Sequence, residues 1–231
     1  MAVIDFHSHI LPSVDHGCAD IDECKAQLDI IGSNLTDITV ATPHFYPHVH
    51  KVKSFNETTN RAVSELKASK QHAHSKICVG AEVLLCEGLE SMDELSSLCI
   101  KGTKCMLIEL PTHALKNGHF DTIEYMLANS YTVILAHIDR YFKICPNDVD
   151  ALISMGALAQ INADALFQHS SRKRIFKYLE HSECISALGS DLHGSDPASY
   201  KHFIKASKVL KEYYQAIMSR AEVLLSDAEK F

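Results

Sequence analysis

The sequence predicts one α/β domain in which parallel strands close, or nearly close, into a barrel of seven strands. Seven short apolar runs alternate with amphipathic stretches of helical periodicity, which is the pattern of repeated strand–helix units. Seven such units with right-handed crossovers favour a TIM-like (β/α)7 barrel over an open doubly wound sheet. No Gly-, Ser- or Pro-rich linker divides the 231 residues, so we expect a single domain spanning 1–231.

The expected elements follow one another along the whole chain. A first strand at residues 3–5 leads through a loop to Asp20, a side chain suited to cap the N-terminus of a helix at 21–32. Further strands are expected at residues 37–42, 76–85, 105–110, 131–137, 157–162 and 184–190. Further helices are expected at residues 55–71, 92–98, 120–128, 148–155 and 172–181, and over a tail at 200–229 that is broken at most once.

The composition is that of a soluble globular protein, with 46% hydrophobic and 22% charged residues. The formal net charge of -7 argues against nucleic acid as a partner, because such binding relies on a basic surface that releases counterions from phosphates. An anionic substrate stays possible, since three divalent cations would add about +6 at one place and reverse the local field.

Targeting signals and cysteines both indicate the cytoplasm. The N-terminus has no basic stretch followed by a long apolar run, and no run of eighteen or more apolar residues predicts a membrane span. The eight cysteines include no Cys-x-x-Cys pair, so we expect reduced thiols.

Side chains that bind metals follow six of the predicted strands. The carboxyl ends of parallel barrel strands share one face, so these side chains should meet in one pocket. The residues concerned are His7 and His9, His44, Glu82, Glu109, His137, and Asp191 with His193; Asp15 adds a carboxylate from the first loop.

The spacing of these residues supports a metal site. Residues two apart on an extended strand point the same way, so His7 and His9 can grip one ion, and Asp191 and His193 repeat the pattern. An ionised carboxylate such as Glu82 rarely stays in an apolar strand without a partner. Imidazoles and carboxylates without thiolates suit Zn, Mn or Fe(II) better than a structural zinc site.

Several of these residues also have a plain structural interpretation. His44 or His137 taken alone is more typical of a hydrogen-bonded histidine at a strand end, and Asp15 of a turn beside a glycine. His48 and His50 form a second His-x-His, but beside a proline in a loop they favour a solvated loop or a substrate rim.

These motifs closely resemble the PHP (polymerase and histidinol phosphatase) superfamily, and within it the manganese-dependent tyrosine phosphatases of bacterial capsule and exopolysaccharide operons. The resemblance spans about residues 3 to 195. The matching segments are residues 5–12, 15–17, 41–44, 80–82, 107–109, 136–141, 160–163 and 190–193.

The resemblance implies a distorted seven-stranded barrel that holds three divalent metals. It assigns His7, His9, Glu82 and Asp191 to the first ion; Glu82, Glu109 and His137 to the second; and Asp15, His44 and His193 to the third. It also implies a phosphotyrosine protein as substrate, such as a bacterial tyrosine kinase.

Two segments depart from the family pattern and leave substrate choice open. The family usually has Asp-Asp-Gly at residues 15–17, where this chain has His16 in the middle. It usually has His-Pro-Glu-Arg-Tyr at residues 137–141, and the missing proline bears on the position of Arg140. Neither departure removes an expected ligand.

The expected reaction is hydrolysis of a phosphate monoester by water that the metal ions activate. We expect Arg140 to grip the phosphoryl group in a bidentate manner that lysine cannot copy; the alternative is a salt bridge to Asp139 or another carboxylate. His44 or His193 can assist proton transfer if not fully committed to metal.

Other activities are weighed against this one. A small-molecule phosphoesterase such as a histidinol-phosphate phosphatase is the nearest alternative. A metal-dependent amidohydrolase or deoxyribonuclease also opens with His-x-His, and a non-enzymatic binding domain would have no reason to keep so many buried charges. No cysteine is followed six positions later by arginine, which excludes a Cys-x5-Arg phosphate loop.

Overall fold

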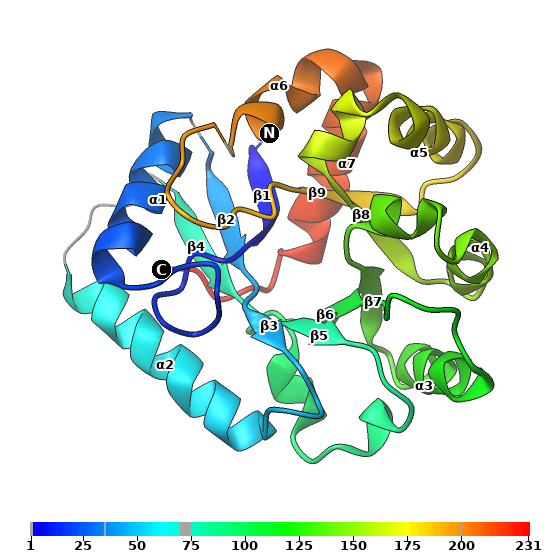
Figure 1. Ribbon diagram of the computed structural model, residues 1–231, viewed down its shortest axis with the longest axis horizontal. Coiled ribbons are helices and arrows are strands. Elements are labelled where there is room, and N and C mark those ends of the chain that lie inside the picture. The colour runs from blue at the N-terminus through cyan, green and yellow to red at the C-terminus, as the bar shows by residue number, and fades with distance from the viewer. Residues whose placement is uncertain (1, 35, 70–74, 199) are drawn as a thin grey trace.

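The computed structural model describes residues 2–34, 36–69, 75–198 and 200–231. Within them, nine parallel-paired strands form two sheets with helices around them (Figure 1). One sheet has the order β1-β2-β4 and the other the order β3-β5-β6-β7-β8-β9. The strands are β1 (Ile4–Ser8), β2 (Ile38–Ala41), β3 (His44–Phe45), β4 (Lys76–Val79), β5 (Glu82–Leu84), β6 (Cys105–Glu109), β7 (Thr132–Leu135), β8 (Leu158–Asn162) and β9 (Ile185–Gly189).

Seven α-helices and four short 3-10 helices connect the strands in the described part of the chain. The α-helices are α1 (Ile21–Ser33), α2 (Val52–Ala68), α3 (Asn117–Ala128), α4 (Pro146–Ser154), α5 (His169–His181), α6 (Lys201–Leu210) and α7 (Glu212–Leu224). The 3-10 helices are η1 (Leu89–Ser91), η2 (Leu95–Leu98), η3 (Ile138–Phe142) and η4 (Ala163–Phe167). The last helix, α7, contacts both β1 and β9.

The predicted α/β class with parallel strands is confirmed, but the predicted closed ring of seven strands is not found. The predicted strand at residues 37–42 is β2, which Pro43 separates from the additional strand β3. The predicted strand at residues 76–85 is divided into β4 and β5 at Gly80 and Ala81. Proline has no N–H to donate to a sheet ladder, which accounts for the first break. Gly80 packs closely on the next segment, since a Cβ there would lie 3.2 Å from the Ile100 backbone.

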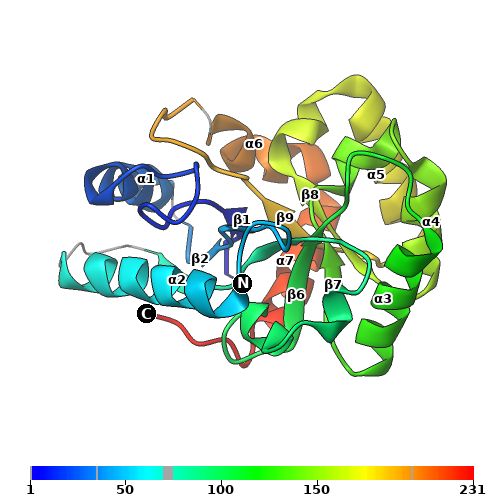
Figure 2. The same ribbon diagram turned by 60° about the horizontal axis from the view of Figure 1, so that its bottom comes forward.

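The first and last strands meet at the end that bears the predicted ligands (Figure 2). Asp191 N donates to His7 O at 2.9 Å and His9 N donates to Leu192 O at 3.0 Å. A buried side chain strengthens this junction, because the Asp5 carboxylate accepts a hydrogen bond from Ser190 N at 2.8 Å. Segments almost two hundred residues apart are therefore joined by backbone hydrogen bonds.

A local sequence signal accounts for the start of α1. The Asp20 side chain caps α1 as predicted, accepting from Asp22 N at 3.0 Å and Glu23 N at 2.9 Å. The tail breaks once, between α6 and α7, where Lys211 has a φ of 51°. The helix predicted at 92–98 is instead the pair of short turns η1 and η2, and the predicted end of the helix at 55–71 lies partly outside the described residues.

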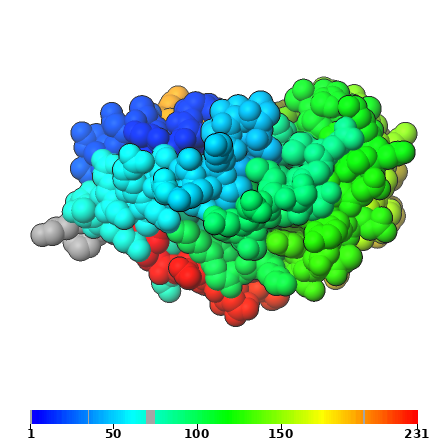
Figure 3. All heavy atoms as spheres, turned by 90° about the horizontal axis from the view of Figure 1, so that it is seen from below, coloured from blue at the N-terminus to red at the C-terminus, as the bar shows by residue number. Residues whose placement is uncertain are grey.

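The C-terminal residues pack onto the edge of the three-stranded sheet. Ile77 and Phe231 exchange backbone hydrogen bonds of 2.9 and 3.2 Å, and the Lys67 ammonium lies 4.3 Å from the centre of the Phe231 ring. Figure 3 shows this red segment against the cyan surface of α2. All eight cysteines are free thiols, and none of the described helices is long and apolar enough to cross a membrane.

The substitution Gly189→Ala tests whether β9 must approach its neighbouring strands closely. A Cβ at this position would lie 2.6 Å from both His7 Cβ and Gln160 Nε2, so we expect Gly189→Ala to lower the free energy of unfolding by about 2 kcal/mol or more. Urea denaturation followed by circular dichroism measures this change.

Gly118→Ala is the matched control. Its added Cβ would meet only the end of the Glu87 side chain, which is partly exposed and free to move, and alanine is the better helix former. We expect a neutral or slightly stabilising effect. Equal destabilisation by both substitutions would show that β9 has no special need for glycine.

Candidate metal centre

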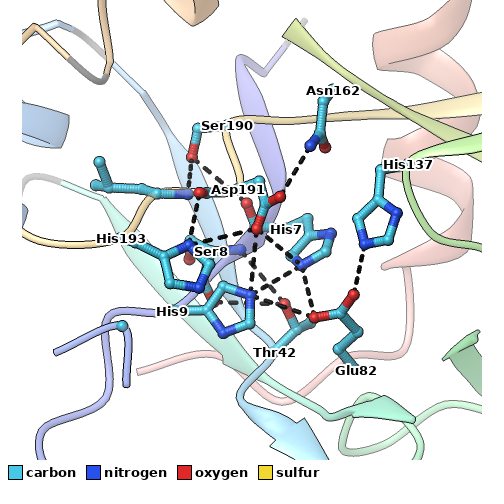
Figure 4. Close-up of polar contacts among 12 residues, drawn as sticks. His7, Ser8, His9, Thr42, Glu82, His137, Asn162, Ser190, Asp191 and His193 are labelled. Carbon is cyan, nitrogen blue, oxygen red and sulfur yellow. Dashed lines mark hydrogen bonds and ion pairs between the residues drawn. The ribbon is translucent and has the colours of Figure 1, made fainter. Parts of the chain in front are cut away.

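The structure brings all nine predicted ligand residues into one cluster at the carboxyl ends of the strands. Figure 4 shows His7, His9, Glu82, His137, Asp191 and His193. Four of the nine lie within strands, and His137 and Asp191 lie just beyond β7 and β9. These last two have positive φ values of 29° and 54°, a conformation that costs energy in non-glycine residues and is typical of functional sites. The nine residues are His7, His9, Asp15, His44, Glu82, Glu109, His137, Asp191 and His193.

Glu82 lies at the centre of the cluster and is fully buried. One carboxylate oxygen, Oε1, is 2.6 Å from His137 Nε2. The other, Oε2, is 2.8 Å from His44 Nδ1 and 3.3 Å from the Nε2 atoms of both His7 and His9. Burial alone would raise the pKa of this carboxyl, but the surrounding imidazoles hold it well below its ordinary value.

Hydrogen bonds on the side away from the cluster fix the tautomers of His7 and His9. His7 Nδ1 is 3.2 Å from Gln160 Oε1, and His9 Nδ1 is 2.7 Å from Asp15 Oδ2. Both oxygens only accept, so each Nδ1 must be the donor, which leaves the two Nε2 atoms to face the cluster. These Nε2 atoms lie only 3.0 Å apart. Two facing lone pairs at this distance require positive charge between or upon them.

The last motif of the chain completes this side of the cluster. The His193 imidazole donates from Nδ1 to the Asp191 carbonyl oxygen at 2.9 Å, and its Nε2 is buried with no hydrogen-bond partner among the described residues. Asp191 Oδ1 lies 3.6 Å from His7 Nε2 and 3.4 Å from His9 Nε2. Burial opposes ionisation of Asp191, but the charge on His7 and the hydrogen bond from His9 lower its pKa far below the ordinary range.

Three overlapping groups have their ligand atoms within 4.8 Å of one another, which is the spacing that a shared ion requires. They are His7, His9 and Glu82; His44, Glu82 and Glu109; and His9, His44 and His193. Among the described residues, the buried His193 Nε2 atom has no hydrogen-bond partner, and it belongs to the third of these groups. The donor set therefore fits divalent cations, because oxygen and imidazole ligands without thiolates suit Zn, Mn or Fe(II).

Asp15 and His137 each contact further members of the cluster. Asp15 holds ligands from behind: besides its contact with His9, its Oδ2 accepts from His44 N at 2.9 Å and its Oδ1 from Gly17 N at 2.9 Å. His137 is 3.8 Å from the Glu109 carboxylate but much closer to Glu82. The division of nine ligands among three ions stays a prediction.

Gln160 and Asn162 support the cluster, and sequence reasoning gave neither of them a role. Gln160 Oε1 also accepts from His137 N at 2.6 Å, so one amide fixes two candidate ligands. Asn162 Nδ2 donates to Asp191 Oδ2 at 2.9 Å. Their signal in the sequence is a pair of buried polar residues on the inward side of a strand, where each must find a partner. Such residues typically orient metal ligands.

Arg140 lies at the rim with 42% of its side chain exposed. Its guanidinium bridges two candidate ligands, at 3.0 Å from Glu109 Oε1 and 3.2 Å from Asp191 Oδ2. The neighbouring Asp139 instead accepts a hydrogen bond from Asn162 N at 2.9 Å, and burial raises its pKa to about 6. Arg140 therefore pairs with other carboxylates than the adjacent one.

Two rings that sequence reasoning did not assign to the site stack on His44 at its mouth. The His16 ring is 5.0 Å from the His44 ring at an interplanar angle of 11°, and the Tyr46 ring is 5.1 Å away at 18°. Burial, together with the nearby Glu109 and Glu82 carboxylates, raises the pKa of Tyr46 to about 12, so its hydroxyl stays protonated. Of the second His-x-His, His50 contacts Tyr46 and His48 is exposed.

The parallel α/β fold and the buried histidine–carboxylate cluster place this protein in a broad class. Its members are α/β proteins with a candidate metal centre at the ends of the strands. The family described as "Capsular polysaccharide synthesis, CpsB/CapC" matches residues 3–230. The chain belongs to this family, which confirms the resemblance predicted from its motifs.

Relatives with known names are distant but cover most of the chain. The tyrosine-protein phosphatase CpsB of Streptococcus agalactiae serotype III is 24% identical over 204 residues, covering 84% of each chain. CpsB of Streptococcus pneumoniae is 26% identical over 214 residues, again covering 84% of each. The tyrosine-protein phosphatase YwqE of Bacillus subtilis is 25% identical over 244 residues, covering 99% of this chain and 94% of its own.

Solved structures show the same fold. A structure of YwqE from Bacillus subtilis and CpsB from Streptococcus pneumoniae, described as metal-dependent tyrosine phosphatases, superposes with a TM-score of 0.81 at 23% identity, covering 99% of this chain and 96% of that one. The histidinol phosphate phosphatase of Lactococcus lactis, complexed with zinc, L-histidinol and phosphate, gives a TM-score of 0.52 at 12% identity, covering 94% and 93%. The first likeness is much the closer of the two.

Glu82→Gln tests whether the central carboxylate holds cations. Glutamine keeps the shape but removes the charge that faces the imidazoles, so we expect zinc or manganese to bind at least tenfold more weakly to the metal-free variant than to the wild type. Isothermal titration calorimetry measures this change. Glu87→Gln, at a half-exposed carboxylate five residues on, should bind the ions as the wild type does. Unaltered affinity in Glu82→Gln would contradict the central role of this carboxylate.

Proposed function

We propose that this protein is a metal-dependent phosphatase that hydrolyses phosphotyrosine in proteins, with residues 1–231 as one catalytic domain acting in the cytoplasm. The observation that carries this proposal is the pair of His7 and His9 Nε2 atoms, 3.0 Å apart and each 3.3 Å from Glu82 Oε2. That geometry is strained without a cation and suited to one. The names of the relatives, all tyrosine-protein phosphatases, support the same activity.

We propose three divalent ions, of Mn, Zn or Fe, held by the nine clustered residues. Such ions lower the pKa of water and neutralise charge on phosphoryl oxygens. The protein supplies the surroundings: Gln160 and Asn162 hold the ligand side chains in place from behind. A metal-assisted displacement requires the polypeptide to hold the metal ligands in a fixed orientation, and these hydrogen bonds do so.

Arg140 is the residue we propose to bind the phosphoryl group. Among the described residues, Arg140 is the one arginine whose side chain contacts the cluster. It lies in η3 at the rim of the cluster. Cations held by Glu109 and Asp191 would compete for these carboxylates, and the guanidinium would then be free to offer two parallel N–H donors to phosphate oxygens. His44 and His193 are proposed to assist proton transfer, although a phenolate leaving group, with a conjugate-acid pKa near 10, needs little help.

The aromatic mouth favours an aryl phosphate over an alkyl phosphate. The Tyr46 and His16 rings stand beside the cluster and are only partly covered, so they can pack against the ring of a phosphotyrosine. Histidinol phosphate would present an alkyl phosphate instead. A protein substrate, such as a tyrosine kinase that bears phosphotyrosine, therefore fits better than a small alkyl ester.

Metal removal combined with three substrates tests this function. We expect the metal-loaded protein to hydrolyse a phosphotyrosine peptide and p-nitrophenyl phosphate, with kcat/KM for the peptide at least tenfold above that for histidinol phosphate. Thorough chelation should abolish turnover of all three, and manganese or zinc should restore it. Activity that survives complete metal removal would falsify the proposal, and a preference for histidinol phosphate would replace its substrate.

Arg140→Ala separates phosphate binding from metal binding. Loss of two charge-assisted hydrogen bonds should lower kcat/KM for p-nitrophenyl phosphate by about 10²-fold or more, since each is worth roughly 1.5–3 kcal/mol. The metal content by mass spectrometry should stay that of the wild type. Arg140→Lys should restore little, because lysine lacks the planar pair of donors. Wild-type turnover in Arg140→Ala would mean that its salt bridges are only structural.

A further inference from the structure

A groove of about 1490 Å³ lies on the outside of the fold, along α5. Its walls come from α5, from the start of α4 and from the turn between α6 and α7. In Figure 1 these elements occupy the rim of the molecule beyond β8. None of the nine clustered residues lines it, so it is separate from the candidate metal centre.

The groove carries the opposite charge to the protein as a whole. Six Arg or Lys side chains line it against three carboxylates, a formal +3 in a chain of -7. Arg174 pairs with Asp150 at 3.3 Å and stacks over the Phe142 ring. The remaining five are exposed, and no ion pair joins any of them to the described residues. These five are Arg172, Lys173, Lys177, Lys208 and Lys211.

Apolar side chains stand between these cations. The Phe176 ring meets the Tyr213 ring edge-on at 5.9 Å, and both are only partly buried. Val209 lies beside them in the lining. Phe176 comes from α5 and Tyr213 from α7, so the aromatic pair spans the groove. Aromatic rings and arginine side chains are enriched at surfaces that bind polypeptides.

The direction of α5 connects the groove to the catalytic face. Strand β8 ends with Asn162, which holds Asp191, and η4 then leads directly into α5. The helix returns to β9, which runs parallel to β8, so its first turn lies on the side of the metal cluster and its last turn on the opposite side. A segment lying in the groove therefore starts near the catalytic face and extends away from it.

We propose that this groove binds an acidic segment of the phosphoprotein substrate, in the chain that flanks the phosphotyrosine. The proposal rests on the proposed phosphatase function. A protein of net charge -7 would otherwise repel an acidic partner, and a local cluster of unpaired cations reverses that repulsion where contact is made. The aromatic pair takes up an apolar side chain of the same segment.

A polypeptide suits the groove better than a nucleic acid. Glu180, Glu212 and Asp150 also line the walls, and a chain that carries a phosphate at every step would meet them. A peptide can place its carboxylates against the lysines and an uncharged residue elsewhere. Recognition of acidic motifs by clusters of basic side chains is a known mode of peptide binding.

The test compares two phosphotyrosine peptides of equal length on the metal-loaded, full-length protein. One has glutamate and a leucine in its flank, and the other has alanine at those positions. We expect kcat/KM to be about tenfold higher for the acidic peptide in wild-type protein, mainly through a lower KM, and the advantage to shrink at high salt. In the double variant with Lys173→Glu and Lys177→Glu, and separately in that with Lys208→Glu and Lys211→Glu, the ratio should fall to about one.

The control reverses two exposed cations outside the groove, Arg61→Glu with Lys76→Glu, and should keep the wild-type ratio. Binding of the unphosphorylated acidic peptide, followed by fluorescence anisotropy, reports on the groove without any turnover. A ratio near one in the wild type, an equal loss in the control, or tighter binding of a single-stranded oligonucleotide than of the peptide would each overturn the proposal. If the peptide binds through the groove but phosphotyrosine is not hydrolysed, only the proposed function fails.

Discussion

The buried Glu82 carboxylate and the imidazoles around it impose the constraint on which the rest of this structure depends. A carboxylate without solvent contact is stable only when positive charge surrounds it, and here four histidines approach it within 3.3 Å. Those histidines come from strands and loops spread over more than half of the chain. If one of these segments were displaced, the buried charge of Glu82 would lose part of its compensation. The cluster therefore costs free energy by burying charge, and it also favours the one arrangement of segments that compensates this charge.

The fold meets this constraint through the ends of its strands rather than through a regular closed ring. The sheet ladder is interrupted at Pro43 and again at Gly80, and in each case a candidate ligand follows within two residues. On the other side, β1 and β9 approach so closely that Gly189 has no room for a side chain. Irregular strand ends let side chains converge on one point, which straight strands around a wide ring would hold apart.

Arg140 links the electrostatics of the cluster to its chemistry. In the described structure it neutralises Glu109 and Asp191, which is a stabilising arrangement for two acidic groups side by side. Cations at the same carboxylates would take over that task. In the groove along α5, five basic side chains have no ion-pair partner among the described residues and are available to another molecule.

The sequence by itself predicted the α/β class, the capped start of α1 and the nine residues that gather in the cluster. Each depends on local rules: periodicity, capping, and the convergence of parallel strand ends. Only the tertiary structure decided which atoms meet. Gln160 fixes two histidines, Asp15 supports His9 from behind, and Phe176 meets Tyr213 across a basic groove. Such contacts join residues distant in the chain, and the positions of their side chains follow from packing, which no single-sequence pattern encodes.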